Sequence, residues 1–420
     1  MPSERMLVVM RPFNPPLPFG IQLKSLAAIV IASGLAIAPC HAESSLGSSK
    51  RQKPIADMDF ELVGGRIYVP CTINGHVGTA VLDTGAGANV LNLNLVERWK
   101  LKSSGALNVQ GAGEKTITGK MLSDTSLKIG PINVSMMFAI PIPELSAMEG
   151  RPMQAIVGYG FFSKYIVEID YAKKHLRVFN PEDAVKAKGM EVPIHFVSAL
   201  PHISSAMTIG DQTYKMETMV DTGASAASLT THFLQDHPLK VESTPETIIG
   251  AGVGGSTLGR LFRPTSVEIA GSSFAKPVIA MTTSKGGVIG GQANFDFLMG
   301  ADFLKRFVVT VDYPHKKFIF DPNETVNTPF EADKVGLRIY SEGADYHTFR
   351  VVGVLDGASG SKAGIKPDDL IASIDGKPAS EYSLTDLREL FKSPAATEWK
   401  VGLIRKGQPI QVVIAAKSII

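Results

Sequence analysis

The tetrapeptide Asp83-Thr84-Gly85-Ala86 occurs a second time as Asp221-Thr222-Gly223-Ala224, 138 residues further along the chain (221 − 83). Each copy follows an apolar run of the kind that forms strands, residues 79–82 in the first case and 217–220 in the second. A single Asp-Thr-Gly often marks an ordinary turn. Two copies, at a spacing that suits two successive small β domains, indicate an internal duplication.

The surroundings of the two tetrapeptides repeat as well. An apolar segment with a central glycine follows each copy, Ile156–Phe162 in the first half and Leu298–Leu304 in the second. These segments are 142 residues apart (298 − 156), and so are the Asp-Tyr turns that begin at Asp170 and Asp312. The constant offset indicates a repeat with only small insertions.

This ordered set of motifs resembles the retropepsin-like aspartic proteases over residues 58–322, and bacterial members with two such units and a C-terminal PDZ domain in particular. The resemblance implies an all-β fold in which two acid-protease β-barrel units pack as a bilobal pair. It implies that Asp83 and Asp221 form the catalytic pair of an aspartic-type endopeptidase. Retroviral enzymes build this site from two identical chains, whereas here one chain can supply both halves.

The resemblance also implies roles for the rest of each tetrapeptide. The supporting residues are Thr84, Gly85, Ala86, Thr222, Gly223 and Ala224. The threonine hydroxyls would brace the two loops against each other, and the glycines would let the backbone approach the carboxylates. The alanines stand where pepsin-type enzymes carry a hydroxyl. Because a hydroxyl that donates to the ionised carboxylate lowers its pKa, its absence predicts activity at weakly acidic to neutral pH.

The mechanism expected of such a pair needs no metal and no cofactor. Two carboxyl groups about 3 Å apart cannot both ionise, so they share one proton. The ionised group takes a proton from water while the other donates to the peptide carbonyl oxygen. The pair titrates as a unit, and we assign no fixed role to either member. The sequence contains no His-Glu-x-x-His motif, and its two cysteines are too few for a structural zinc cluster.

A glycine cluster lies between each tetrapeptide and its apolar segment. We interpret the two clusters as flap hairpins over a substrate cleft, and the expected flap glycines are Gly111, Gly113, Gly250 and Gly252. The second cluster also has the spacing of a dinucleotide-binding loop, but the following residues 256–260 do not start an apolar-striped helix. A pair of plain glycine-rich turns is the remaining alternative.

The tail resembles the PDZ domains of bacterial proteases, mainly through Ala363–Ile371. The resemblance implies an α+β domain whose peptide-binding loop is formed by Gly336, Leu337, Arg338 and Ile339. Ser383 is expected to cap a helix over residues 384–391. A PDZ groove takes an extended peptide, often a C-terminus, as an added strand. Here the domain would recruit substrate, dock on the protein's own protease core, or only stabilise the chain.

The N-terminus predicts export. Basic residues precede the apolar stretch 25–38, and small residues lie before Ala42, as in a secretory signal peptide. The alternative, a membrane anchor, is disfavoured by the short apolar length. We therefore expect a periplasmic protein without a stable membrane span after cleavage. Only Cys71 would then remain, which excludes an intramolecular disulfide and indicates a buried, inert thiol.

The expected organisation has six parts. They are a signal peptide (1–42), a flexible lead-in (43–57), a first unit (58–181), a linker (182–192), a second unit (193–322), and a linker with the PDZ domain (323–420). The formal net charge of +2 offers no electrostatic argument for a nucleic-acid partner. The expected partners are protein or peptide substrates and a C-terminal peptide at the PDZ domain.

Three functional classes fit these features. The first is an exported aspartic endopeptidase with a recruiting PDZ domain. The second is a catalytically silent peptide-binding scaffold, and the retention of both aspartates with their Thr-Gly partners argues against it. The third is a protease that is active only as a homodimer. Covalent linkage of the two units favours pairing within one chain, through their high effective concentration.

Overall fold

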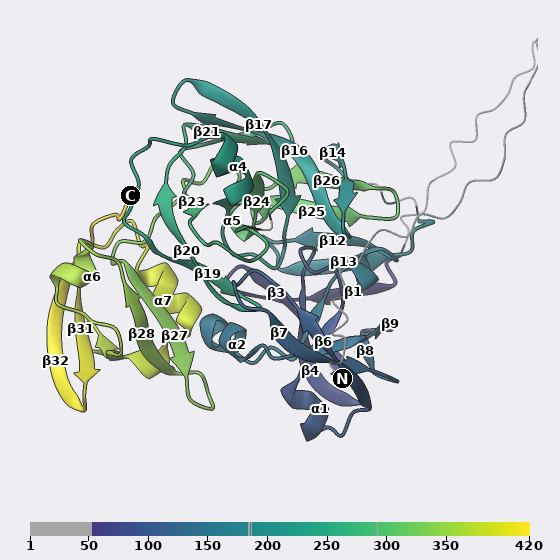
Figure 1. Ribbon diagram of the computed structural model, residues 1–420, viewed down its shortest axis with the longest axis horizontal. Coiled ribbons are helices and arrows are strands. Elements are labelled where there is room, and N and C mark those ends of the chain that lie inside the picture. The colour runs from purple at the N-terminus through teal and green to yellow at the C-terminus, as the bar shows by residue number, and fades with distance from the viewer. Residues whose placement is uncertain (1–52, 184, 186, 292) are drawn as a thin grey trace, which may run out of the picture. The chain divides into compact units, whose positions relative to one another are not determined.

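The structure, a computed structural model, describes residues 53–183, 185, 187–291 and 293–420 (Figure 1). The predicted signal peptide and most of the predicted lead-in lie outside the described residues. The described chain contains four sheets connected by loops and short helices. None of these helices has the length and apolar character needed to cross a membrane.

The first half of the repeat forms one ten-stranded sheet. Its strands are β2 (Glu61–Val63), β3 (Arg66–Ile73), β4 (His76–Leu82), β5 (Val90–Asn92), β6 (Ser103–Val109), β7 (Ile117–Leu122), β8 (Ser126–Ile129), β9 (Ile132–Ser135), β10 (Phe138–Ile140) and β11 (Ala155–Val157). Their order is β6-β7-β10-β5-β11-β4-β3-β8-β9, with β2 beside β3.

The second half forms another ten-stranded sheet of the same design. Its strands are β15 (His195–Val197), β16 (Leu200–Ile209), β17 (Gln212–Val220), β18 (Ser228–Leu229), β19 (Thr247–Gly252), β20 (Gly255–Phe262), β21 (Ser266–Ile269), β22 (Ser272–Ala275), β23 (Ile279–Thr282) and β24 (Phe297–Met299). Their order, β19-β20-β23-β18-β24-β17-β16-β21-β22 with β15 beside β16, matches the first sheet strand for strand. The predicted all-β class and the duplication are confirmed.

A six-stranded sheet joins the two halves. Its strands are β1 (Ala56–Asp59), β12 (Ile166–Asp170), β13 (His175–Phe179), β14 (Met190–Pro193), β25 (Phe307–Asp312) and β26 (Lys317–Pro322), in the order β1-β13-β12-β25-β26-β14. The two strands that end in the Asp-Tyr turns, β12 and β25, pair antiparallel in its middle. The two halves of the repeat therefore pair with each other in this sheet.

Two predicted boundaries need correction at this sheet. The interval 182–192 was expected to be a linker throughout, but Met190–Pro193 forms β14 along the free edge of β26. The lead-in was expected to extend to residue 57, but β1 begins at Ala56 and pairs with β13. Both are edge strands of only four residues, too short for a periodic pattern to identify, and their pairing covers the edges of the sheet.

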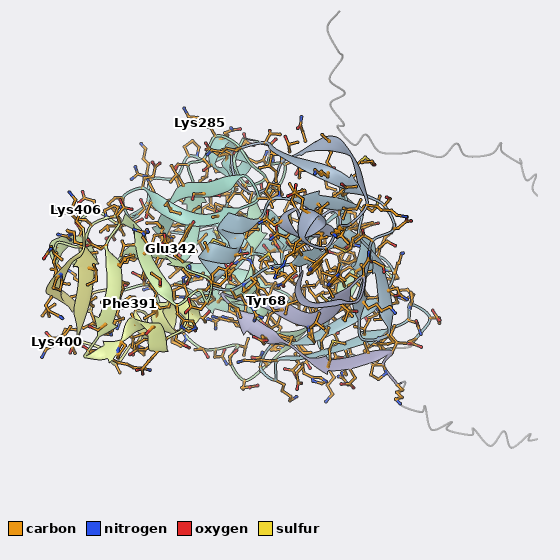
Figure 2. The ribbon with its side chains drawn as sticks, turned by 90° about the horizontal axis from the view of Figure 1, so that it is seen from below. Tyr68, Lys285, Glu342, Phe391, Lys400 and Lys406 are labelled. Carbon is orange, nitrogen blue, oxygen red and sulfur yellow. The ribbon has the colours of Figure 1, made fainter. Side chains whose placement is uncertain are left out.

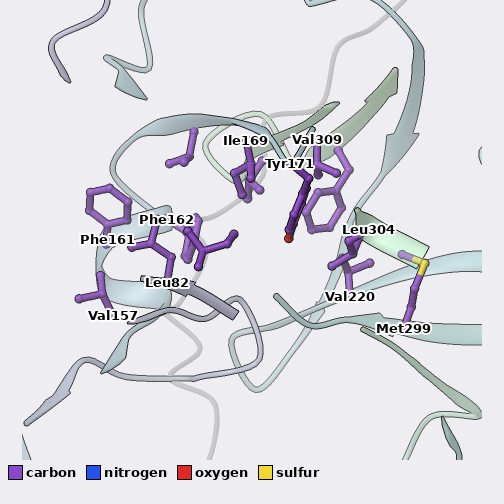
Figure 3. Close-up of a cluster of buried hydrophobic side chains, with 14 of the residues drawn as sticks. Leu82, Val157, Phe161, Phe162, Ile169, Tyr171, Val220, Met299, Leu304 and Val309 are labelled. Carbon is purple, nitrogen blue, oxygen red and sulfur yellow. The ribbon is translucent and has the colours of Figure 1, made fainter. Parts of the chain in front are cut away.

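The hydrophobic core is continuous across both halves, as Figure 3 shows. Side chains from both ten-stranded sheets and from the joining sheet meet there; examples are Leu82, Val157, Phe162, Ile169, Tyr171, Val220, Met299, Leu304 and Val309. Cys71 is buried in the same core, where burial raises the pKa of its thiol to about 12. The thiol therefore stays protonated and unreactive at physiological pH.

The tail folds around a core of its own that includes Trp399. Its elements are β27 (Leu337–Glu342), β28 (Thr348–Val354), α6 (Ser359–Lys362), β29 (Leu370–Ile374), β30 (Lys377–Pro378), the 3₁₀ helix η1 (Ala379–Glu381), α7 (Leu384–Leu390), β31 (Glu398–Arg405) and β32 (Gln408–Ala415). The sheet order is β27-β28-β29-β31-β32, so β27 is an edge strand. The predicted helix is confirmed, and Ser383 and Asp386 form its capping box.

The other helices are α1 (Asn94–Arg98), α2 (Pro143–Glu149), α3 (Tyr159–Phe162), α4 (Thr231–Asp236) and α5 (Ala301–Leu304). Helices α1 and α4 occupy equivalent places in the two halves, and so do α3 and α5. Helix α2 breaks the symmetry, because residues 283–296, which take its place in the second half, include no helix where the structure describes them. It contacts both β27 and β19 (Figure 1).

Candidate active site

Each tetrapeptide forms a loop at the end of a strand, β4 in the first half and β17 in the second. The apolar segments run parallel to these strands, as β11 beside β4 and β24 beside β17. The N–H of Asp83 donates to the carbonyl of Val157 at 2.9 Å, and that of Asp221 donates to the carbonyl of Met299 at 3.0 Å. The two halves thus support their loops in the same way.

Glycine is required where each apolar segment passes under its loop. A Cβ at Gly158 would lie 2.2 Å from the carbonyl oxygen of Ala86, and one at Gly300 would lie 2.7 Å from that of Ala224. Such distances are far inside van der Waals contact. The repeated glycine of the apolar segments is therefore explained by the close passage of two backbones.

The two loops are bound to each other by four hydrogen bonds. The N–H groups of Thr84 and Thr222 each donate to the other residue's hydroxyl, both at 3.0 Å. The Thr84 hydroxyl donates to the carbonyl of Val220 at 2.7 Å, and the Thr222 hydroxyl donates to that of Leu82 at 2.9 Å. Both threonines are fully buried.

The glycines bring each loop against the opposite carboxyl group. A Cβ at Gly85 would lie 2.4 Å from Cγ of Asp221, and a Cβ at Gly223 would lie 2.3 Å from Cγ of Asp83. The two carboxyl groups interact directly as hydrogen-bonded neighbours. The structure therefore brings together all of the expected residues of the two tetrapeptides, from one chain.

The environment of the carboxyl groups favours their protonated forms. Burial, followed by the charge of Asp221, raises the pKa of Asp83 well above its ordinary value. Burial also raises the pKa of Asp221, against the opposing effects of its hydrogen bonds to Asp83 and to the N–H of Gly223. The pair retains a shared proton at a pH where an isolated aspartate would have lost it.

A buried ion pair near the carboxyl groups was not predicted from the sequence. Arg66, at the start of β3, pairs with Glu149, at the end of α2. The two residues are only 7% and 2% exposed. The charge of Arg66 opposes the upward pKa shift of both Asp83 and Asp221. No local pattern points to this pair, because 83 residues separate its members.

The glycine clusters form the tips of two antiparallel hairpins, β6–β7 and β19–β20, which contact each other. The N–H of Gly113 donates to the carbonyl of Val253 at 2.9 Å, and that of Lys115 donates to the carbonyl of Gly254 at 3.0 Å. A hairpin is not the strand-turn-helix unit of a dinucleotide-binding loop, so that alternative is not supported.

Residues of the hairpins share hydrophobic clusters with the two tetrapeptide loops. Val253 belongs to the same hydrophobic cluster as Ala86, and Ile249 to the same cluster as Ala224. Of the expected flap glycines, Gly111, Gly113 and Gly252 lie in the contact between the hairpins, whereas Gly250 faces open space. The tips of the two hairpins therefore contact each other through three of the four expected glycines.

The four residues expected to bind a peptide carboxylate, residues 336–339, lie at the start of β27. They are separate from the Asp83–Asp221 pair, the dyad. Gly336 has a φ of 72°, and the side chains of Leu337 and Ile339 are buried in the core of the tail domain. Arg338 is partly buried, with a pKa lowered by desolvation. The carbonyl of Ile339 already accepts a hydrogen bond from Arg388 of α7.

One cluster in the second half has side chains of the metal-binding type. Potential ligand atoms of His195, His202 and Glu217 lie within 4.8 Å of one another. His202 is buried, and its Nδ1 lies 2.8 Å from Glu217. A metal on Nδ1 would force the proton onto Nε2, which has no hydrogen-bond partner among the described residues. The cluster therefore fits a hydrogen bond between His202 and Glu217 better than it fits a metal centre.

Comparison with known proteins agrees with this geometry. The aspartyl protease family model matches the chain twice. The matches cover residues 69–161 and 206–303, so each contains one tetrapeptide and the central glycine of one apolar segment. The two matches agree with the predicted pair of repeated units, and a protease is the activity that they support.

Two curated proteins are similar over shorter stretches. The periplasmic pH-dependent serine endoprotease DegQ of Escherichia coli is 38% identical over 61 residues, which is 14% of this chain and 13% of DegQ. The DNA damage-inducible protein 1 of Chaetomium globosum is 26% identical over 133 residues, 30% of this chain and 26% of that protein. The chain thus spans about a quarter or less of either relative.

Proposed function

We propose that this protein is an aspartic endopeptidase in which Asp83 and Asp221 of one chain activate water. The observation that carries the proposal is the reciprocal contact between the loops. The Thr84–Thr222 bonds and the approach of each glycine to the opposite carboxyl group hold two acids side by side. Two unrelated turns that merely pack together would not be expected to form such reciprocal contacts.

The chemistry follows from the shared proton. A water between the carboxyl groups loses a proton to the ionised member and attacks the carbonyl carbon of the peptide bond. The protonated member donates to the carbonyl oxygen as the tetrahedral intermediate forms. The carboxyl group that took the proton from water then passes it to the leaving nitrogen, and the other carboxylate takes a proton from a hydroxyl of the intermediate. The C–N bond breaks, the new carboxyl and amine products leave, and the pair is again singly protonated.

We further propose that the tail is a PDZ domain and that the protein is exported. The capped α7 beside the edge strand β27 supports a peptide-binding domain of this kind. The basic and apolar sequence before Ala42 supports export to the periplasm. The similarity to a periplasmic endoprotease over 61 residues agrees with the proposed export.

Cleavage of casein by residues 43–420 across about pH 3–8 tests the activity. The proposal expects cleavage by the unmodified chain and loss of at least about 10³-fold in kcat in both Asp83→Asn and Asp221→Asn. Absence of cleavage at every pH, with the chain folded, would favour the silent peptide-binding scaffold. Undiminished cleavage by either variant would overturn the assignment of the dyad.

The same two variants separate a single-chain site from an obligate homodimer. In a homodimer that pairs like units, Asp83→Asn would leave the second-unit site intact, and Asp221→Asn would leave the first. Each variant would then keep a substantial part of the activity. With the site formed inside one chain, each variant is inactive, and size-exclusion chromatography finds activity in the monomer fraction.

A further inference from the structure

The tail domain contacts the end of α2, a helix of the first unit. Nη2 of Arg388, on α7, donates to the carbonyl of Met148 at 2.6 Å and to that of Ile339 at 3.1 Å. A Cβ at Gly150 would lie 2.8 Å from Cβ of Leu384, so the chain after α2 is pressed against α7. Figure 1 shows α2 beside α7 and β27.

A second contact joins the tail to the start of the first unit. The N–H of Gly64 donates to the hydroxyl of Thr385, also on α7, at 3.3 Å. Gly64 lies two residues before Arg66, and a Cβ on it would lie 2.1 Å from Oε2 of Glu149. Helix α7 therefore touches both segments that carry the buried ion pair.

The ion pair is placed to act on the dyad. Arg66 precedes Ile67, which pairs with Leu82 directly before Asp83. Burial of both Arg66 and Glu149 removes the screening by water, so their charges act over a longer range than surface charges do. Arg66 thus links a helix held by the tail domain to the two carboxyl groups.

We propose that Arg66 and Glu149 are positioning residues for the catalytic dyad, and that the tail domain controls the dyad through them by holding α2 in place. The inference rests on the proposed function and deepens it. It makes the tail domain a component of the active site in addition to any part it has in peptide binding. Loosening of the contact between α7 and α2 then changes catalysis without any change in the dyad itself.

Several other titratable groups face this network. Glu149 faces Arg66, Tyr68 and Arg388, and the dyad faces Arg66, Tyr171 and Tyr313. Desolvation raises the pKa of each of the three tyrosines, so they stay neutral across the working range. Tyr68 is buried, whereas Lys285 and Lys406 are exposed; all three are labelled in Figure 2. Desolvation lowers the pKa of Arg388 to about 10, where it is still charged near neutral pH.

The sign of the effect follows from these charges. Glu149→Gln removes the anion that balances Arg66 and leaves an amide oxygen to accept the guanidinium hydrogen bond. The uncompensated Arg66 then stabilises the ionised dyad more strongly, and its pKa falls. Arg388→Met frees α2 and moves the pKa in the same direction by a smaller amount. Because both act through one contact, the double variant shifts the pKa no further than Glu149→Gln does.

A titration of the aspartate carboxyl groups by ¹³C NMR tests the proposal, with Asp83→Asn and Asp221→Asn used for assignment. We expect Glu149→Gln to lower the dyad's apparent pKa by about 0.5 unit or more. The acid limb of the kcat/KM profile is expected to move with it. Arg350→Met is the matched control, because Arg350 pairs with Glu342 within the tail domain and forms no hydrogen bond or ion pair with α2 in the described part of the chain.

The titration separates this inference from the proposed function, because it reads the carboxyl groups whether or not the chain cleaves. Unchanged dyad pKa values in folded Glu149→Gln and Arg388→Met would overturn the inference and leave the protease assignment intact. Shifted pKa values without cleavage would uphold the inference and overturn the protease. If Glu149→Gln does not fold, the dyad pKa of Arg388→Met alone tests the inference. A pKa shift in Arg388→Met no larger than that in Arg350→Met would overturn the inference.

Discussion

The N–H of Thr84 donates to the hydroxyl of Thr222, and the N–H of Thr222 donates to the hydroxyl of Thr84, at the same distance of 3.0 Å. Each hydroxyl in turn donates a hydrogen bond to a carbonyl at the end of the other unit's strand, Val220 or Leu82. The two halves of the repeat are thus joined, next to the carboxyl groups, by a closed set of buried bonds. A change in one half acts on the geometry of both.

Thr84→Val should destabilise the chain and reduce activity together. The valine has nearly the same shape but leaves the N–H of Thr222 and the carbonyl of Val220 buried without partners. Each orphaned group costs about 1–3 kcal/mol, so we expect urea denaturation to show a loss of about 2–4 kcal/mol. Thr84→Ser keeps the hydroxyl and should stay close to the unmodified chain. Equal stability of the valine and serine variants would show that the bonds contribute little.

Gly85→Ala should abolish activity with the fold retained. The added methyl group would lie 2.4 Å from Cγ of Asp221 and must push the two carboxyl groups apart. A displacement of about 1 Å at the reacting groups can cost 10²-fold in rate, and we expect at least that loss in kcat. Gly87→Ala is the control, since the nearest atom to its Cβ is 3.7 Å away. Similar losses in both variants would contradict this account of Gly85.

Gly113→Ala should weaken catalysis through the hairpins. Its Cβ would lie 2.2 Å from the carbonyl carbon of Gly254 and force the two tips apart. We expect kcat/KM to fall by about tenfold, equivalent to roughly 1.4 kcal/mol of transition-state stabilisation. Gly250→Ala places its methyl group in open space and should behave like the unmodified chain. Steady-state kinetics with a synthetic peptide that contains a casein cleavage site compares kcat/KM of the two variants and the unmodified chain.

Asp83→Asn should stabilise the protein at neutral pH. A carboxyl group whose pKa is raised on folding contributes its stability below its unfolded pKa and loses it as the pH rises through the folded value. Because burial raises the pKa of Asp83, the aspartate weakens the fold above that pH and the amide does not. We expect Asn to raise Tm at pH 7 by about 2 °C or more and to leave it nearly unchanged at pH 3.5. A lower Tm at pH 7 would contradict the direction of the shift.

The activity should be greatest at weakly acidic to neutral pH. Both aspartates have raised pKa values, and Ala86 and Ala224 supply no hydroxyl to stabilise the ionised form. Ala224→Ser should move the acid limb of the kcat/KM profile to lower pH, because its hydroxyl donates to the carboxylate. An optimum below about pH 3.5 in the unmodified chain would be incompatible with this reading.

The candidate site was largely predictable because its parts are local and repeated. Each tetrapeptide follows an apolar strand, and the apolar segment with its glycine recurs at a constant offset. The equivalence of the two halves can therefore be predicted from the sequence. Strand β14 was missed because Met190–Pro193 is an edge strand with mostly exposed side chains. Its place depends on the free edge of β26, which is far away in the sequence.

Short-range patterning and a fixed repeat specify local backbone geometry, so the two equivalent loops with one aspartate each follow from the amino-acid sequence alone. Which charges face those aspartates depends on how the folded chain packs. Glu149 reaches Arg66 across 83 residues, and Arg388 reaches Met148 across 240. The energy of a charge depends on how far water is excluded around it and on which partner lies beside it. Both are properties of the packed molecule, and no single segment of the chain contains them.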